Sequence, residues 1–160
     1  MPIDALRLAN LIDTHAVALQ LWVRSSCLSC EDVVQEAFTR LALQEPVPDN
    51  PVAWLYRVSR NLALKQRLSD SRQRHREQLV AQSEASQLAP DPLELADLRQ
   101  AIERLDDELR EVLVAHLWGQ LPLEEIGQLC GISTATAFRR YEAALVALRS
   151  MLEPKCENRT

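Results

Sequence analysis

Glycine and aromatic side chains are scarce in this chain: its 160 residues include only 3 glycines, 3 tryptophans, 2 tyrosines and 2 phenylalanines. The sequence therefore has no glycine-rich phosphate loop, and it also lacks a nucleophile elbow. Charged residues interrupt every apolar run, so neither a secretory signal nor a membrane span is expected. The histidines, His15, His75 and His116, lie far apart. We therefore expect a cytoplasmic protein that is not an enzyme, binds no cofactor and has no membrane partner.

Alanine, leucine, arginine, glutamine and glutamate dominate the composition, which favours an all-α fold. A length of 160 residues permits one ordinary domain or two small ones. Helical periodicity is lost over 78–92, where serine, alanine, glutamine and proline are frequent, as is typical of a flexible linker. The sequence thus predicts two small helical domains, at 1–77 and 93–153, joined by this linker and followed by a frayed tail at 154–160.

Apolar residues recur at three- and four-residue steps in both predicted domains, as in amphipathic helices. Ser29 with Asp32 resembles a capping box, and Asn50 precedes a proline suited to a first helical turn. In the helix after Asn50, Trp54 and Leu68 are expected to face the core. The predicted helices span 4–24, 29–43, 51–76, 93–105, 107–118, 122–130 and 134–152.

The formal net charge of −5 is distributed unevenly. Residues 57–76 hold seven basic side chains and one acid, giving +6, whereas 1–56 carry −4 and 77–160 carry −7. Such a basic block is a footprint of nucleic-acid binding, although a charge run is more often a solvated helix end. Asn50, Tyr56 and Asn61 lie among or beside these cations, and stacking and amide groups in that setting suit a single strand with exposed bases.

Residues 121–152 have the pattern of a helix-turn-helix, in which the second helix enters the major groove. Gly131 is expected to end the first helix in a left-handed conformation, and Ser133 to N-cap the second. A helical hairpin that merely packs would give the same pattern. Arg139 and Arg140 favour DNA binding, because arginine contacts guanine edges and phosphates.

Cys27 and Cys30 form a C-x-x-C motif, which is typical of a metal site or a redox pair. A structural zinc needs four ligands, and the sequence contains neither a second C-x-x-C nor an H-x₃-H after it. No strand is predicted before the motif, as a thioredoxin-like site would require. We therefore predict no metal site, interpret both cysteines as small residues at helix ends, and place Cys130 in the helix-turn-helix core.

Three ordered blocks of the chain resemble the extracytoplasmic-function (ECF) group of bacterial RNA polymerase sigma factors. They are CEDVVQEAFTRL at 30–41, PVAWLYRVSRNLALKQR at 51–67, and the segment 98–152, with T-A-F-R-R and a terminal A-L-x-x-L-R. The first two are similar to sigma region 2 and the third to region 4. The ending R-R-Y-E-A-A-L-x-A-L-R also resembles a planctomycete-type subgroup.

This resemblance implies a subunit that binds core RNA polymerase, at the β′ clamp helices and the β flap, and directs promoter recognition and transcription initiation. It also allows for an anti-sigma factor as a further partner, whose presence the sequence leaves open. The residues matching the polymerase-docking helix are Asp32, Gln35, Glu36 and Phe38. Those matching the segment that binds the melted promoter element at roughly −10 are Asn50, Arg57, Asn61, Lys65 and Arg67. Those matching the recognition helix for the duplex element at roughly −35 are Ser133, Thr134, Thr136, Phe138, Arg139 and Arg140.

Two residues depart from the family pattern. Ala137 stands where valine is usual, and Phe138 replaces a polar residue. The Phe138 ring could contact a thymine methyl group or rest on the neighbouring helix. Two other functions fit the sequence: a stand-alone helix-turn-helix regulator that binds paired half-sites as a dimer, and a sigma-like adaptor that binds proteins but no promoter.

Overall fold

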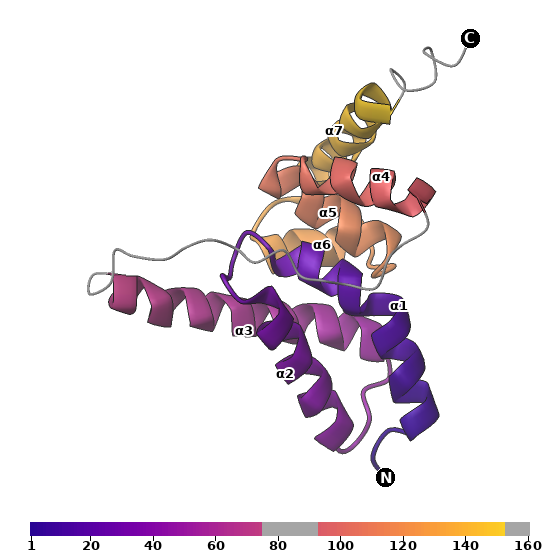
Figure 1. Cartoon of the computed structure of the whole chain (residues 1–160), viewed down its shortest axis with the longest axis vertical. Helices are drawn as coiled ribbons and strands as arrows, with labels where there is room; N and C mark the ends of the chain where they lie inside the picture. Colours follow the sequence, from indigo (N-terminus) through magenta and orange to yellow (C-terminus); the bar gives the residue numbers. More distant parts are fainter. Residues whose placement is uncertain (75–92, 153–160) are drawn as a thin grey trace. The chain divides into compact units, whose positions relative to one another are not determined.

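Figure 1 shows a computed structural model of the chain, in which residues 1–74 and 93–152 are described. Every regular element in these two ranges is an α-helix, which confirms the all-α prediction. The helices are α1 (Ala5–Val23), α2 (Cys30–Leu43), α3 (Pro51–Arg74), α4 (Leu93–Glu103), α5 (Asp107–Leu117), α6 (Leu123–Cys130) and α7 (Thr134–Leu152). None of the described helices combines the length and the apolar character needed to cross a bilayer.

The contacts within the chain divide it into two units, Met1–Ser86 and Gln87–Thr160. The predicted linker at 78–92 and the predicted tail at 154–160 lie outside the described residues. The domain boundaries and the flexibility of the linker therefore stay predictions. We use the name unit 1 for the helices α1–α3 and the name unit 2 for the helices α4–α7.

Unit 1 is a bundle in which α1, α2 and α3 each pack against the other two. Trp22 lies at its centre: the indole N–H donates to the Tyr56 carbonyl oxygen at 3.0 Å, and the Arg60 guanidinium lies 5.4 Å from the Trp22 ring centroid. The start of α3 is capped as predicted, since the Asn50 side chain accepts the backbone N–H of Ala53 at 3.1 Å. This cap fixes where α3 begins.

Three predictions for unit 1 are wrong in detail. Tyr56 is fully buried beside Trp22, so its ring is not available for stacking on a base. Leu68 faces solvent with 68 % of its surface exposed, because α3 continues beyond the helices that cover its first half. The Ser29 hydroxyl donates to the Asp32 carboxylate at 2.6 Å and makes no capping bond to the backbone of α2.

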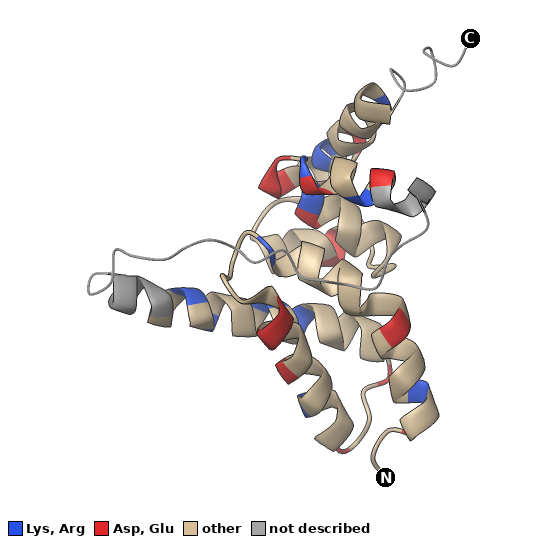
Figure 2. Cartoon of the chain, in the orientation of Figure 1, with Lys and Arg blue, Asp and Glu red and all other residues tan. Residues whose placement is uncertain are grey.

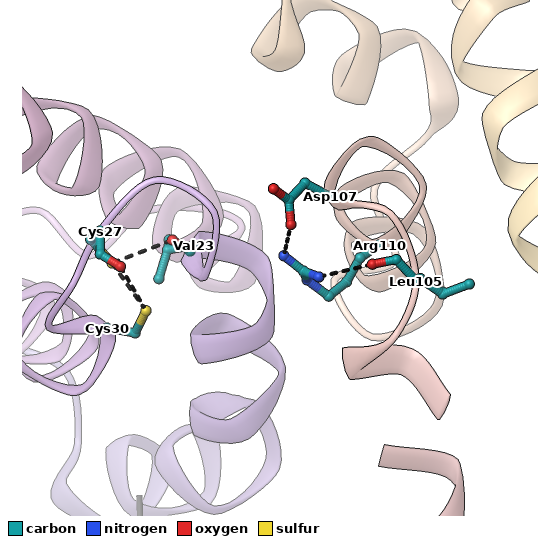
Figure 3. Close-up of polar contacts among 6 residues, drawn as sticks. All are labelled: Val23, Cys27, Cys30, Leu105, Asp107 and Arg110. Atoms are coloured by element: carbon teal, nitrogen blue, oxygen red, sulfur yellow. Dashed lines mark hydrogen bonds and ion pairs between the residues drawn. The ribbon is translucent and has the colours of Figure 1, made fainter. Parts of the chain in front are cut away.

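Unit 2 is built around α7, which packs on α4, α5 and α6. Arg110 is the buried cation of this unit: it donates to the Leu105 carbonyl oxygen at 3.1 Å and to the Asp107 carboxylate (Figure 3). The His116 ring meets the Tyr141 ring edge-on at 4.7 Å between centroids. Leu117, near the end of α5, is nearly half exposed.

The corner between α6 and α7 depends on two glycines. Gly131 has φ 70°, the left-handed conformation predicted for it, and it ends α6. Gly127 is required for a different reason: a Cβ there would lie 2.8 Å from the Ile132 carbonyl oxygen. The Ser133 hydroxyl then accepts the backbone N–H of Thr136 at 3.1 Å, which confirms the predicted N-cap of α7.

Candidate nucleic-acid and partner interfaces

The predicted polymerase-docking residues lie on α2, and three of them share its exposed face. Asp32, Gln35 and Glu36 succeed one another at steps of three and one residues, so they form one continuous patch, which we call the docking surface. Phe38 is on the opposite side of the helix and only 6 % exposed. It belongs to the core of unit 1, where it holds the docking surface in place from beneath.

The carboxylates of the docking surface already have local partners. Asp32 accepts from the Ser29 hydroxyl, and Glu36 forms an i,i+4 ion pair with Arg40 at 2.9 Å. The side chains of Glu36 and Arg40 are each about half exposed, so this pair is weak, of the order of 0.5 kcal/mol. A competing cation from a partner can therefore displace Arg40 at little cost. Figure 2 shows the acidic residues on α2.

The predicted strand-binding residues on α3 also share one face. Arg57, Asn61, Lys65 and Arg67 are all exposed, and at about 100° per residue they span an arc of about 160° on the helix. We call them, together with Asn50, the strand surface. Figure 2 shows the cations along α3. The exposed side chains of Leu64 and Leu68 fall within this arc, so apolar and cationic groups alternate there.

Asn50 and Arg57 are both positioned by the first turns of α3. Asn50 uses its carbonyl oxygen for the helix cap, and a carboxamide also has two N–H donors that such a cap does not employ. The Arg57 Nε donates to the Ala53 carbonyl oxygen at 3.4 Å, and its side chain is exposed. The strand surface thus offers donors, cations and apolar patches, the groups that bind a backbone and unstacked bases.

The predicted recognition residues gather at the start of α7. The Ser133 hydroxyl donates to the Thr136 hydroxyl oxygen at 2.9 Å, and an Arg139 Nη donates to the same oxygen at 3.2 Å. Thr134 is exposed beside them. This chain of hydrogen bonds pre-orders the first turn and holds the Arg139 guanidinium close to it, which suits contact with base edges.

Three neighbouring residues of α7 have distinct environments. Ala137 is fully buried, so it lies in the core of unit 2. The Phe138 ring is 49 % exposed. An Arg140 Nη lies 3.4 Å from the Glu108 carboxylate of α5, so this cation is shared with an acid of its own unit. We name Ser133, Thr134, Thr136, Phe138, Arg139 and Arg140 the recognition surface.

Residues 95–148 match the family described as Sigma-70, region 4, and this segment includes α5, α6 and most of α7. The helix-turn-helix lies inside the match. The match favours a helix-turn-helix at 121–152 over a helical hairpin that merely packs. The recognition surface of unit 2 lies within the matched segment.

Two solved structures share the fold over nearly the whole chain. One is the sigma factor RpoE in complex with the anti-sigma factor NepR from Bartonella quintana, with a TM-score of 0.64, 22% identity, and coverage of 94% of this chain and 98% of that one. The other is CnrH in complex with the cytosolic domain of CnrY, with a TM-score of 0.51, 23% identity, and coverage of 94% and 90%. No curated protein sequence matches this chain. The findings confirm the resemblance to ECF sigma factors and leave the planctomycete-type subgroup a prediction.

The structure brings the predicted residues together in three patches, two on unit 1 and one on unit 2. Sequence reasoning missed Gly127, Leu64 and the exposure of Leu68. Gly127 had a signal, since a glycine inside a short apolar helix calls for a close-packing reason. The two leucines had none, because helical periodicity shows which face is apolar but not where the covering helices end.

Proposed function

We propose that the chain is an ECF-type sigma factor, which binds core RNA polymerase and directs promoter recognition and transcription initiation. The observation that carries this proposal is the region 4 match at 95–148, within a fold that a sigma factor shares over 94% of this chain. The protein works in the cytoplasm, without catalysing a reaction itself. The deciding experiment is run-off transcription of a genomic library by core polymerase, with and without the purified chain. A lack of any promoter-dependent transcript contradicts the proposal.

The docking surface binds the β′ clamp helices of polymerase through Asp32, Gln35 and Glu36, while Phe38 supports it from the core. Exposed carboxylates suit a basic partner surface, because each would exchange a weak local contact for one at the interface. Replacing both Asp32 and Glu36 with lysine should abolish polymerase binding in a pull-down or an anisotropy titration. The matched control reverses the exposed acids Asp13 and Glu45 in the same unit, and it should bind normally. Retained binding by the first variant would place docking elsewhere.

The recognition surface reads the duplex element upstream, and polymerase contact at the β flap brings unit 2 to DNA. Arg139 is the cation held over the first turn of α7, where a recognition helix meets base edges. Arg139→Ala should lower promoter-specific transcription at least about fivefold, since a bidentate base contact contributes about 1–3 kcal/mol. Arg149→Ala removes an exposed arginine from the last turn of the same helix and should leave transcription unchanged. Equal loss in both variants would indicate a non-specific charge effect.

Phe138 contacts the methyl group of a thymine in that element. The half-exposed ring leaves apolar surface that a methyl group can cover. Replacing thymine by deoxyuridine removes this methyl group and should weaken binding about fourfold. That corresponds to about 0.8 kcal/mol for the burial of one such group. Phe138→Ala should bind both DNAs equally. If the variant still distinguishes thymine from deoxyuridine, the ring is not the methyl contact.

The strand surface holds the melted element. Lys65 and Arg67 flank the exposed Leu64 on α3, so a phosphate backbone and a base can be bound together. Replacing Lys65 and Arg67 with alanine should slow promoter opening, measured by 2-aminopurine fluorescence, and leave polymerase binding intact. The control replaces Arg7 and Arg24, exposed arginines of α1 and its C-cap. A variant that opens DNA normally would remove the strand surface from the mechanism.

An anti-sigma factor is a further proposed partner, supported by the two solved relatives of this fold, each of which is in a complex. The other candidate functions make different predictions. A stand-alone regulator would bind a specific duplex tightly without polymerase. An adaptor would support transcription equally well after Arg139→Ala.

A further inference from the structure

The connection between α1 and α2 holds two thiols in contact. The Sγ atoms of Cys27 and Cys30 are 3.1 Å apart, and the Cys27 thiol also lies 3.3 Å from the Val23 carbonyl oxygen at the end of α1 (Figure 3). The Cys30 thiol lies 3.5 Å from the Cys27 carbonyl oxygen. Both side chains are half-buried, so a small oxidant can reach them.

A metal is a poor fit to this pair. Within 1–74 and 93–152, no group of three or more histidine, cysteine or acidic side chains is arranged to hold a metal ion. Cys130 belongs to unit 2, and Cys156 lies outside the described residues. Two thiolates alone do not complete the four-ligand set of a structural zinc. The proximity of the two sulfur atoms therefore points to chemistry between them.

We propose that Cys27 and Cys30 form an oxidation site, which a hydroperoxide converts into an intramolecular disulfide. One thiolate attacks a peroxide oxygen, the O–O bond breaks, and a sulfenic acid and an alcohol or water are produced. The second thiolate attacks the sulfenic sulfur and releases water, so that two thiols are oxidised while one hydroperoxide is reduced. The sulfur atoms have to approach by only about 1 Å to reach a disulfide bond length.

The disulfide would alter the start of the docking helix, an effect that rests on the proposed function. Cys30 is the first residue of α2 and precedes Asp32 by two positions. Oxidation removes both S–H donors, including the one facing the last turn of α1, and draws Cys27 toward α2. The Ser29–Asp32 hydrogen bond lies inside the segment that has to adjust. Oxidation should therefore weaken polymerase binding about fivefold, the loss expected when one exposed charged contact is displaced.

The first test is chemical and independent of polymerase. Cleavage after Arg24 and Arg40 releases a peptide, Ser25–Arg40, that contains Cys27 and Cys30 and neither of the other cysteines. After hydrogen peroxide treatment of the full chain, this peptide should be lighter by two hydrogens and resist alkylation. Sulfinic or sulfonic products on this peptide, or a disulfide that links it to a second chain, would overturn the proposal. Cys27→Ser should prevent the loss of two hydrogens.

The second test measures polymerase binding by the reduced and the oxidised chain. Weaker binding after oxidation, reversed by dithiothreitol and absent in the Cys27→Ser/Cys30→Ser double variant, supports the regulatory effect. Equal binding in the two states overturns that effect and leaves the proposed function intact. If the reduced chain does not bind polymerase, docking and its regulation both fail, whereas the peptide mass still judges the oxidation site separately.

Discussion

The two units differ in how fully their buried polar groups are hydrogen-bonded. Among the described residues, the buried side-chain atoms that lack a hydrogen-bond partner all belong to unit 1: His15 Nδ1, Tyr56 Oη, Ser59 Oγ and Gln66 Oε1. In unit 2 the buried Arg110 is bonded to a carbonyl oxygen and a carboxylate. Unit 1 thus relies on apolar packing around Trp22 and tolerates buried polar atoms that have no hydrogen-bond partner, whereas unit 2 relies on particular polar contacts.

This difference fits the sequence match found for unit 2. A bundle held by apolar packing accepts many substitutions of similar volume, so its sequence can change while its fold persists. A helix-turn-helix corner needs Gly127, Gly131 and Ser133 at fixed positions. The family match at 95–148 includes this corner, and the fold match extends over unit 1. Single substitutions should therefore destabilise unit 2 more than unit 1.

The largest effect is expected from Arg110→Met, which keeps the volume of the side chain but removes the donors to Leu105 and Asp107. Leaving the Leu105 carbonyl oxygen unpaired and removing the charged hydrogen bond to the exposed Asp107 should together destabilise unit 2 by about 3 kcal/mol. Hydrogen exchange read peptide by peptide should show faster exchange in α4–α7 and no change in α1–α3. Arg149→Met, on an exposed arginine, is the control. Comparable loss of protection in unit 1 would show that the units are not independent.

Gly127→Ala should have the next largest effect. Its new Cβ would lie 2.8 Å from the Ile132 carbonyl oxygen, so the corner would have to open. This should lower the free energy of unfolding by about 2 kcal/mol. Gly131→Ala is the matched comparison: its Cβ would meet nothing within 4 Å, so only the left-handed φ of 70° is penalised, at about 1 kcal/mol. Urea unfolding monitored by circular dichroism gives both values. If Gly131→Ala were the more destabilising variant, the close contact between Gly127 and Ile132 would not determine the geometry of this corner.

Most of the fold can be predicted from local sequence, because caps and helical periodicity are local properties. Asn50, Gly131 and Ser133 were predicted as helix-end residues, and the structure confirms each of them. One error concerns a cap, since the Ser29 hydroxyl bonds the Asp32 side chain and not the backbone of α2, and the others concern burial. Tyr56 and Leu68 lie on one helix, yet which of them is covered depends on where α1 and α2 cross α3, a property of the tertiary arrangement.

The candidate site was predictable to a similar extent. Exposed charged positions on one helical face could be identified from spacing, as in the docking surface. The ion pair between Arg140 and Glu108 could not, because it joins α7 to α5 across 32 positions of sequence. The contact between the Cys27 and Cys30 sulfur atoms also depends on side-chain rotation, which the C-x-x-C spacing alone leaves open.

Tyr56→Phe should stabilise unit 1 by about 1 kcal/mol, because it removes a hydroxyl that is buried without a partner among the described residues. Burial also raises the pKa of Tyr56 above its ordinary value of 10.0. The unfolded chain therefore ionises first, and wild-type stability should fall as the pH rises above 10. Unfolding in urea at pH 7 and at pH 10.5 measures both effects. A less stable variant at pH 7 would mean that the hydroxyl is bonded.

The smallest effect at neutral pH is expected at His15, whose buried ring has its pKa lowered from 6.5 by loss of hydration. The ring is neutral in unit 1, so its contribution is complete above pH 6.5 and is lost as the pH falls below 6.5, where the unfolded chain takes up the proton first. His15→Leu and His15→Gln should each lose this part of the acid dependence. Their stability curves from pH 7.5 to 5 should be flatter than the wild-type curve, whatever their absolute values. Parallel curves in all three proteins would show that the His15 pKa is not lowered in unit 1. The burial of this ring would then not reduce the stability of unit 1 in acid.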